Sequence, residues 1–205
     1  MPTPTMPPTV PTASRDPGPL ELLLWEAILY KDLPKVLLLL SDGADPSFRQ
    51  ARGDHWTSAM AACHVRRPDI LGALVSAGAD LSAVNRFGMN ACHFATVESS
   101  PDCLELLIRA GADVHSPDQR RNRDEAWTPA MWAARHGRPE CLALLMRAGA
   151  DLSAMNRSGQ DALRLARYVG HVECCRIIEA WLERQTLQAL TPLGAPPIRT
   201  GRPRI

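Results

Sequence analysis

Two cysteine–histidine pairs are the residues of this sequence whose chemistry could support catalysis. Cys63 is followed directly by His64, and Cys92 by His93. A catalytic thiol needs a histidine within hydrogen-bond reach, a third group that orients the histidine, and a pocket that excludes water. Both pairs lie in alanine-containing stretches with helical spacing, where consecutive side chains point about 100° apart and do not face each other. We therefore predict that the cysteines fill the core, that His93 packs within a helix, and that the chain has no catalytic residue.

The other candidate chemistries are also missing from the sequence. The chain has 6 cysteines, and no two of them have Cys-x-x-Cys spacing. There is no glycine-rich phosphate loop, no paired carboxylate array and no His-x-x-x-His helix. We expect reduced thiols, no metal site, no cofactor and no enzymatic activity.

The middle of the chain is built from a repeated unit. The tripeptide Gly-Ala-Asp begins at Gly43, Gly78, Gly111 and Gly149, each time after an apolar helical stretch, and the intervals are 35, 33 and 38 residues. A period in the thirties with one short supersecondary unit per period indicates stacked repeats, which bury their apolar faces only against neighbours. At least three units are needed, and the sequence has enough.

Each unit follows the same local pattern, which is clearest in the second. Residues 57–65 predict a short helix of small residues with Thr57 as its N-cap. Residues 68–77 predict a second helix, which begins with a proline and carries Asp69 near the positive end of its dipole. Gly78 then ends this helix in a left-handed conformation, and an extended finger leads to the next unit.

This pattern resembles the ankyrin repeat, which runs G-x-T-P-L-H-x-A-A, then G-H, an apolar helix and G-A-D. The fullest match is Thr128-Pro129-Ala130 with Ala133-Ala134, Gly137, Cys141 to Leu145 and Gly149-Ala150-Asp151, whereas Asn90 to Ala95 and Asp161-Ala162-Leu163 with Gly170-His171 match less fully. The resemblance covers about residues 20–184. It implies an all-α fold, an ankyrin-repeat α-solenoid of helix-turn-helix units with short β-hairpin fingers and about ten helices.

Composition divides the chain into three parts. Residues 1–19 contain seven prolines and few large apolar groups, which predicts a disordered proline-rich arm. Residues 20–184 form the ankyrin-repeat domain of about five repeats, with boundaries 20–50, 51–84, 85–117, 123–155 and 156–184. Residues 185–205 predict a helix extension followed by a disordered tail rich in proline and arginine. The first and fifth repeats are expected to cap the stack by shielding its core from water.

Several positions depart from the family pattern. His55 and Ala126 stand where a fingertip glycine is usual, and Arg66-Arg67 and Ser99-Ser100 replace the usual Gly-His between the helices. Either Arg66 adopts a strained left-handed conformation or the loop adjusts. The interval from Asp113 to Thr128 is five residues longer than that from Asp80 to Asn90. This predicts an enlarged finger over residues 115–127.

The resemblance also implies where a protein partner would bind. In ankyrin-like proteins, contacts tend to come from residues just before the Thr position and from the end of the first helix, which together line a concave face. Transferred to this sequence, the partner-binding residues are Trp56, His64, Arg86, Phe87, Met89, Trp127, Arg135, His136, Arg157 and Tyr168. We expect Trp56, Phe87, Met89 and Trp127 to be exposed anchors with arginines at the rim. The alternative is that Trp56 and Trp127 fold back as local packing for irregular fingers.

These features predict a non-catalytic scaffold or adaptor whose protein partner offers an apolar segment flanked by acids. The alternative from another class is a DNA- or chromatin-associated regulator, because residues 199–204 resemble an AT-hook with Gly201-Arg202-Pro203 at its centre. Thr200 replaces the first arginine of that core. The basic run at residues 119–123 lies among Asp118, Asp124 and Glu125, which favours a solvated loop.

Bulk properties fit one ordinary folded domain. The formal net charge is +1 and 45% of residues are hydrophobic, so charge alone points to no nucleic-acid partner. The sequence shows no secretory signal pattern and no apolar run of the roughly 18 residues that a membrane span requires. We expect a cytoplasmic and/or nuclear monomer without membrane association.

Overall fold

The protein is described by a computed structural model that covers residues 18–51, 53–119 and 126–190. These residues contain ten α-helices, two in each of five repeats, and no strand. The all-α repeat solenoid predicted from the sequence is therefore confirmed. Residues 1–17 of the predicted arm, residues 120–123 of the basic run and the AT-hook-like segment lie outside the described residues.

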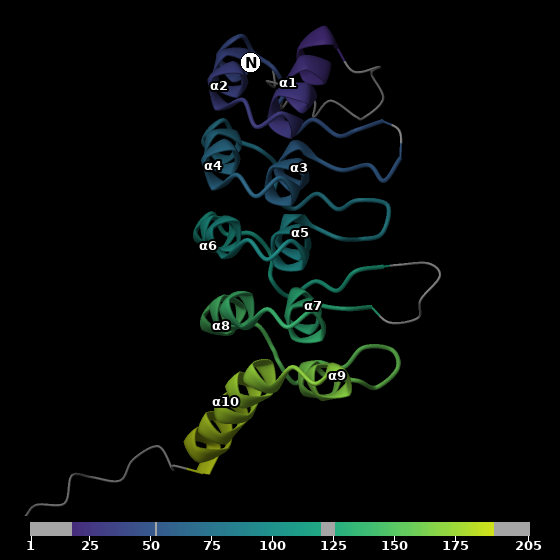
Figure 1. The fold of residues 1–205 in the computed structure, drawn as a ribbon, viewed down its shortest axis with the longest axis vertical. Coiled ribbons are helices and arrows are strands. Elements are labelled where there is room, and N and C mark those ends of the chain that lie inside the picture. The colour runs from purple at the N-terminus through teal and green to yellow at the C-terminus, as the bar shows by residue number, and fades with distance from the viewer. Residues whose placement is uncertain (1–17, 52, 120–125, 191–205) are drawn as a thin grey trace, which may run out of the picture. The chain divides into compact units, whose positions relative to one another are not determined.

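The first compact unit extends to Asp113 and holds three repeats. Its helices are α1 (Pro19–Leu29), α2 (Leu33–Ser41), α3 (Ser58–His64), α4 (Pro68–Ser76), α5 (Ala91–Val97) and α6 (Pro101–Arg109). The two helices of each repeat pack against each other. The first helices α1, α3 and α5 contact one another in succession, and so do the second helices α2, α4 and α6 (Figure 1).

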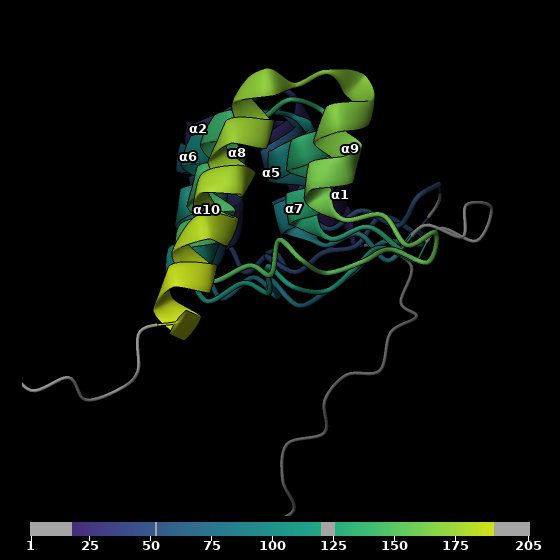
Figure 2. The same cartoon turned by 90° about the horizontal axis from the view of Figure 1, so that it is seen from below.

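The second compact unit begins at Val114 and holds two repeats. Its helices are α7 (Pro129–Arg135), α8 (Pro139–Arg147), α9 (Ala162–Val169) and α10 (Val172–Leu190). The first helices α7 and α9 pack together, and α10 packs on both α8 and α9. Within each unit, first and second helices form separate rows, and the fingers extend on the side of the first helices (Figure 2).

Four of the first helices begin at a side-chain cap. Thr57, Asn90, Thr128 and Asp161 are the N-caps of α3, α5, α7 and α9, and each accepts a hydrogen bond from the backbone N–H three residues later. Each bond satisfies one of the N–H groups that a helix leaves without a partner at its start. The cap predicted at Thr57 is confirmed, and the shared cap fixes where each first helix begins.

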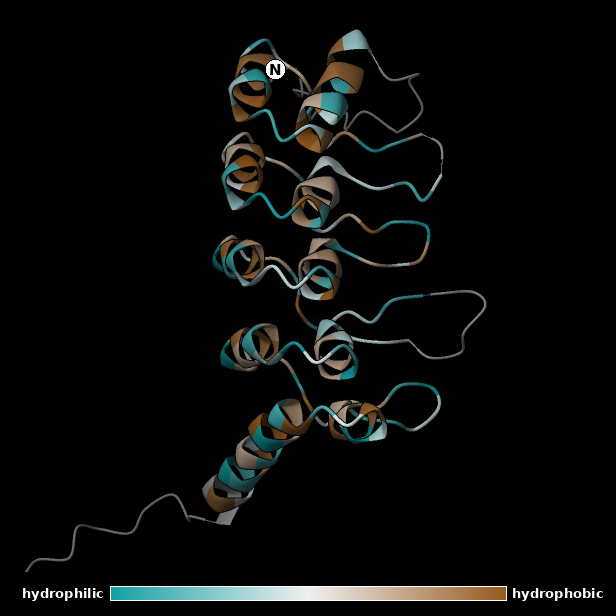
Figure 3. Ribbon diagram, viewed as in Figure 1, coloured by the Kyte–Doolittle hydropathy of each residue, from teal (hydrophilic) through white to brown (hydrophobic). Residues whose placement is uncertain are grey.

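Small residues allow neighbouring repeats to approach closely. Alanine is the most frequent buried residue of the first helices, and Ala61, Ala95, Ala133 and Ala166 are each at 0% exposure. The second helices contribute larger groups to the core, such as Leu74, Leu107 and Leu145. Apolar residues, drawn in brown, occur in the helices of both units (Figure 3). Removing this apolar area from water is the main favourable term in the fold.

The first repeat does not present the shielded face expected of a capping repeat. Six of its large apolar side chains are exposed, namely Leu22, Leu23, Leu29, Tyr30, Leu37 and Leu38. The reason is that α1 and α2 keep the apolar composition of an internal repeat, although within the described residues no repeat packs on their outer side. A sequence pattern identifies a terminal repeat by its position but not by its polarity.

One turn position has a left-handed backbone in all five repeats. Between the paired helices, φ is 61° at Lys31, 56° at Arg66, 54° at Ser99, 61° at Gly137 and 86° at Gly170. Only glycine adopts this region without a steric cost from Cβ. The strained alternative predicted for Arg66 is therefore confirmed: the loop keeps the family geometry although three of the five residues are not glycine.

Replacing Arg66 with glycine should stabilise the protein. The left-handed conformation destabilises the folded state by about 1–2 kcal/mol when the residue is not glycine. Glycine removes this strain but loses more backbone entropy on folding, which offsets about 0.5–1 kcal/mol of the gain. The Arg66 side chain is exposed and makes no hydrogen bond or ion pair among the described residues. We expect Arg66→Gly to raise the free energy of unfolding by about 0.5–1 kcal/mol in urea denaturation.

Gly137→Ala is the reverse control at the same turn position. Alanine would be strained at the positive φ of this position, and its Cβ would lie 2.6 Å from the His171 ring. This variant should therefore be less stable than the wild type. If Arg66→Gly lowered stability, the turn would not be strained at Arg66.

Candidate protein-binding surface

The cysteine–histidine pairs are not assembled for catalysis. Cys63 and Cys92 are fully buried. Burial raises the pKa of Cys92 to about 12, and a hydrogen bond with Cys103 together with burial raises the pKa of Cys63 well above its ordinary value. Thiols with raised pKa values stay protonated near neutral pH and are poor nucleophiles.

The two histidines have other partners. The Nδ1 atom of His64 lies 2.8 Å from Oε1 of Glu98. His93 is buried and belongs to the N-terminal cap of α5, where its Nδ1 lies 3.2 Å from the backbone N–H of Asn90. This agrees with the prediction that His93 packs within its helix.

A side chain at the base of each of three fingers closes the loop. The backbone N–H of Asn85 donates to the carbonyl of Met89, and the N–H of Met89 donates back to Oδ1 of Asn85. Asn156 forms the same two bonds with Gln160. Each of these asparagines is only 5% exposed. The finger is therefore a loop held by an Asn clamp, and the isolated bridge Arg49–Thr57 is the only strand pairing among the described residues.

The enlarged finger is closed by the same clamp with an aspartate. The N–H of Asp118 donates to the carbonyl of Trp127, and the N–H of Trp127 donates to Oδ1 of Asp118 over 2.8 Å. The other carboxylate oxygen accepts a bond from the indole N–H of Trp132 over 3.2 Å. Asp118 is 2% exposed. Asp118 and Trp127 therefore close this finger with the same two bonds that Asn85 and Met89 form in theirs.

This clamp corrects the expected exposure of two anchor residues. Met89 is 5% exposed and Trp127 is 7% exposed, so the expectation that both lie in water is wrong. The reason is their place: each is the closing residue of its finger and comes directly before the N-cap of the next helix. The ring of Trp127 packs edge-on against Trp132, with centroids 4.9 Å apart. For Trp127 the local-packing alternative is the one the structure supports.

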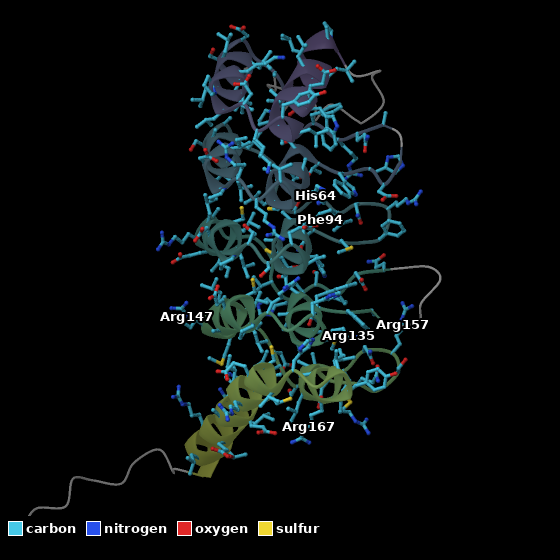
Figure 4. The ribbon with its side chains drawn as sticks, viewed as in Figure 1. His64, Phe94, Arg135, Arg147, Arg157 and Arg167 are labelled. Carbon is cyan, nitrogen blue, oxygen red and sulfur yellow. The ribbon has the colours of Figure 1, made fainter. Side chains whose placement is uncertain are left out.

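In the first unit, Trp56 joins a finger to two helices. Its half-buried ring packs edge-on against His64 of α3 at 5.0 Å and against Phe94 of α5 at 4.7 Å. The pair of His64 and Glu98 links the ends of the same two helices. Figure 4 shows His64 and Phe94 close together on the finger side. Repeats two and three therefore share one partly exposed aromatic cluster.

The fingertip residues of the first unit form a second group. Nη2 of Arg86 lies 2.8 Å from Oδ1 of Asp54 in the preceding finger. The same guanidinium lies over the ring of Phe87, with Cζ 4.6 Å from the centroid. Arg86 is thus held by a charge and by an aromatic face at the same time, which orders two neighbouring fingertips.

The second unit holds the remaining predicted residues. His136 stacks on Trp132 with ring centroids 5.1 Å apart, and the Arg135 guanidinium lies 5.8 Å from the centroid of Tyr168. Tyr168 is 80% exposed, and Arg157 is exposed in the finger before α9. Arg135, Arg157 and Arg167 come from α7, this finger and α9, whereas Arg147 comes from α8 in the other row (Figure 4).

Sequence reasoning missed three residues that shape these surfaces. They are Phe94, Asp118 and Trp132. A signal for Asp118 was present, because Asn85, Asp118 and Asn156 each stand five residues after the aspartate of a Gly-Ala-Asp tripeptide. Such short polar side chains bond readily to nearby backbone. No comparable spacing signal distinguishes Phe94 or Trp132 from ordinary core residues.

Comparison with known families agrees with this architecture. The family model described as ankyrin repeats (3 copies) matches residues 24–118 and again residues 115–180, which together make up most of the chain. The paired helices, capped first helices and fingers are those of a repeat interaction module. This chain belongs to the ankyrin repeat family.

Three similar proteins carry different names. Human B-cell lymphoma 3 protein is 37% identical over 139 residues, which cover 65% of this chain and 29% of that protein. The rat nuclear factor NF-kappa-B p105 subunit is 33% identical over 102 residues, or 47% of this chain and 10% of that protein. Human SH3 and multiple ankyrin repeat domains protein 2 is 30% identical over 165 residues, or 80% of this chain and 8% of that protein. The chain thus spans under a third of each relative.

These comparisons support a general role in protein–protein interaction, and none of the three names denotes an enzyme. Within the described ranges, no three His, Cys, Asp or Glu side chains are grouped so that they could hold a metal ion. None of the helices described by the structure is both long enough and apolar enough to cross a membrane.

Two aromatic substitutions should differ in their effect on the free energy of unfolding, because one ring is buried and the other is exposed. Trp127→Ala removes a buried ring and should lower the free energy of unfolding by about 3 kcal/mol or more. Tyr168→Ala removes a ring that is largely in water and should change it by no more than about 0.5 kcal/mol. Thermal or urea denaturation followed by circular dichroism measures both. Equal effects of the two variants would contradict the assignment of Trp127 to the finger base.

Proposed function

We propose that this protein is a non-catalytic adaptor that binds a protein partner through its finger-and-first-helix surface. We define this surface, in each unit, as the exposed side chains of the fingers and first helices. The observation that carries the proposal is the set of aromatic and cationic residues gathered there. Tyrosine, tryptophan and arginine are the residues most enriched among those that dominate binding energy.

The buried thiols support the non-catalytic part of the proposal. A protein–protein contact needs no activated nucleophile, and the surface residues of this chain fit contact better than catalysis. The partner-binding residues are Trp56, His64, Arg86, Phe87, Arg135, His136, Arg157 and Tyr168, with Met89 and Trp127 supporting the fingers from beneath. The protein acts in the cytoplasm and/or nucleus and as a monomer.

Affinity capture with the full chain, followed by binding measurements with a purified captured protein, tests this proposal. Tyr168→Ala should weaken that binding about tenfold or more, which corresponds to about 1.4 kcal/mol. The reason is that an exposed tyrosine contributes little to folding but a large contact area to an interface.

Leu38→Ala is the matched control, because Leu38 is also largely exposed but lies on the second helix of its repeat. It should leave binding within about twofold of wild type. If Leu38→Ala weakened binding and Tyr168→Ala did not, the finger-and-first-helix surface would not be the site.

A further inference from the structure

The second unit carries arginines that no carboxylate of the described residues neutralises. Arg135 of α7, Arg157 of the following finger and Arg164 of α9 make no ion pair among the described residues. Arg164 instead donates to the carbonyl of Gly159 over 2.9 Å. We infer that this surface binds an acidic protein segment that also carries apolar side chains. This inference rests on the proposed adaptor function and names the chemistry of the partner.

Three described carboxylates of the second unit are already engaged. Asp118 is buried and bonded to Trp127 and Trp132. Asp161 caps α9 by accepting the backbone N–H of Arg164 over 2.7 Å. Glu179 of α10 pairs with Arg167 over 2.6 Å. Within the described residues these arginines therefore have no carboxylate partner. A carboxylate of a binding partner can pair with them, because arginine binds a carboxylate through two parallel hydrogen bonds.

The first unit makes a useful contrast. Its corresponding surface residues are paired within the chain, Arg86 with Asp54 and His64 with Glu98. In such pairs the basic side chain already has a carboxylate partner within the chain. Charge complementarity to an acidic segment is thus a property of the second unit, and it steers association more than it adds affinity.

Exposed apolar groups lie among the arginines of the second unit. Tyr168 is 80% exposed with one face toward the Arg135 guanidinium, and Met155, in the finger with Arg157, is 71% exposed. The aromatic face holds the Arg135 guanidinium in a position to bond a carboxylate of the partner. The rest of the Tyr168 ring remains exposed and can contact an apolar side chain of the partner. An acidic segment with apolar side chains would use both features.

The same features favour a protein over nucleic acid. A phosphate backbone gains affinity from many contacts with cations along its length, whereas this surface offers the three arginines Arg135, Arg157 and Arg164 among the described residues. Of the two exposed apolar groups, Tyr168 offers a ring on which a base can stack and Met155 does not. The experiment must therefore distinguish binding of a protein segment from binding of nucleic acid.

The experiment titrates the full chain into a fluorescein-labelled synthetic peptide in which Asp and Glu alternate with Leu and Phe, and follows fluorescence anisotropy. Arg135→Glu with Arg157→Glu should weaken binding tenfold or more, and so should replacing the peptide's acids with Asn and Gln. Tyr168→Ala should weaken it several-fold. Circular dichroism verifies that each variant is folded.

A second double variant controls for net charge. Arg147→Glu with Arg184→Glu makes the same change in charge on α8 and α10, where both arginines are exposed and make no ion pair among the described residues. It should leave peptide affinity within about twofold. Equal weakening by the two double variants would overturn the inference, because binding would then follow overall charge.

Two other results would also overturn it. The first is tighter binding of a single-stranded oligonucleotide of matched charge that depends on Arg135 and Arg157, which would assign the surface to nucleic acid. The second is no binding of the acidic peptide while a captured protein still depends on Tyr168. In that case the adaptor proposal stands and only the acidic chemistry fails.

Discussion

The fold depends on the close approach of neighbouring first helices. A single pair of helices leaves one apolar face on each side without cover, and only the next repeat can bury it. Buried alanines such as Ala61, Ala95 and Ala133 make this approach possible because they bring no bulk between the helices. The left-handed turn between the helices must then be kept even when its residue is Arg66 or Ser99. Tertiary packing accordingly outweighs a local backbone cost of about 1–2 kcal/mol at each such turn.

The same packing divides the finger-and-first-helix surface into two kinds of residue. Positions directly before the N-cap, such as Met89 and Trp127, close the fingers and turn inward. Positions at the end of the first helix, such as Arg135 and Tyr168, remain in contact with water. The buried ring of Trp127 stabilises the base of its finger, whereas the ring of Tyr168 is exposed and available to a partner. Folding and binding therefore use neighbouring residues of one surface, and mutations can affect either property separately.

Much of the fold could be predicted because the repeat is local. The Gly-Ala-Asp period, the cap at Thr57 and the helix predicted over residues 68–77 follow from short-range rules. The structure confirms the cap and has this helix as α4, Pro68–Ser76. The burial of Trp127 could not be predicted in the same way, because it depends on Trp132 and Asp118, which the fold brings to the finger from either side. The exposed leucines of α1 and α2 also escaped prediction, because their spacing is that of an internal repeat. The pairing of Arg86 with Asp54 required the relative placement of two fingers.

The central claim is that a partner binds on the fingers and first helices and leaves the second helices free. Hydrogen–deuterium exchange of the full chain, with and without a purified captured partner, tests it most directly. Exchange rates report local opening of the backbone and fall where a partner covers it. The account predicts slower exchange at residues 135–136 and 155–168, with no change over the exposed side of α8 and α10. Protection confined to α8 and α10 would contradict it.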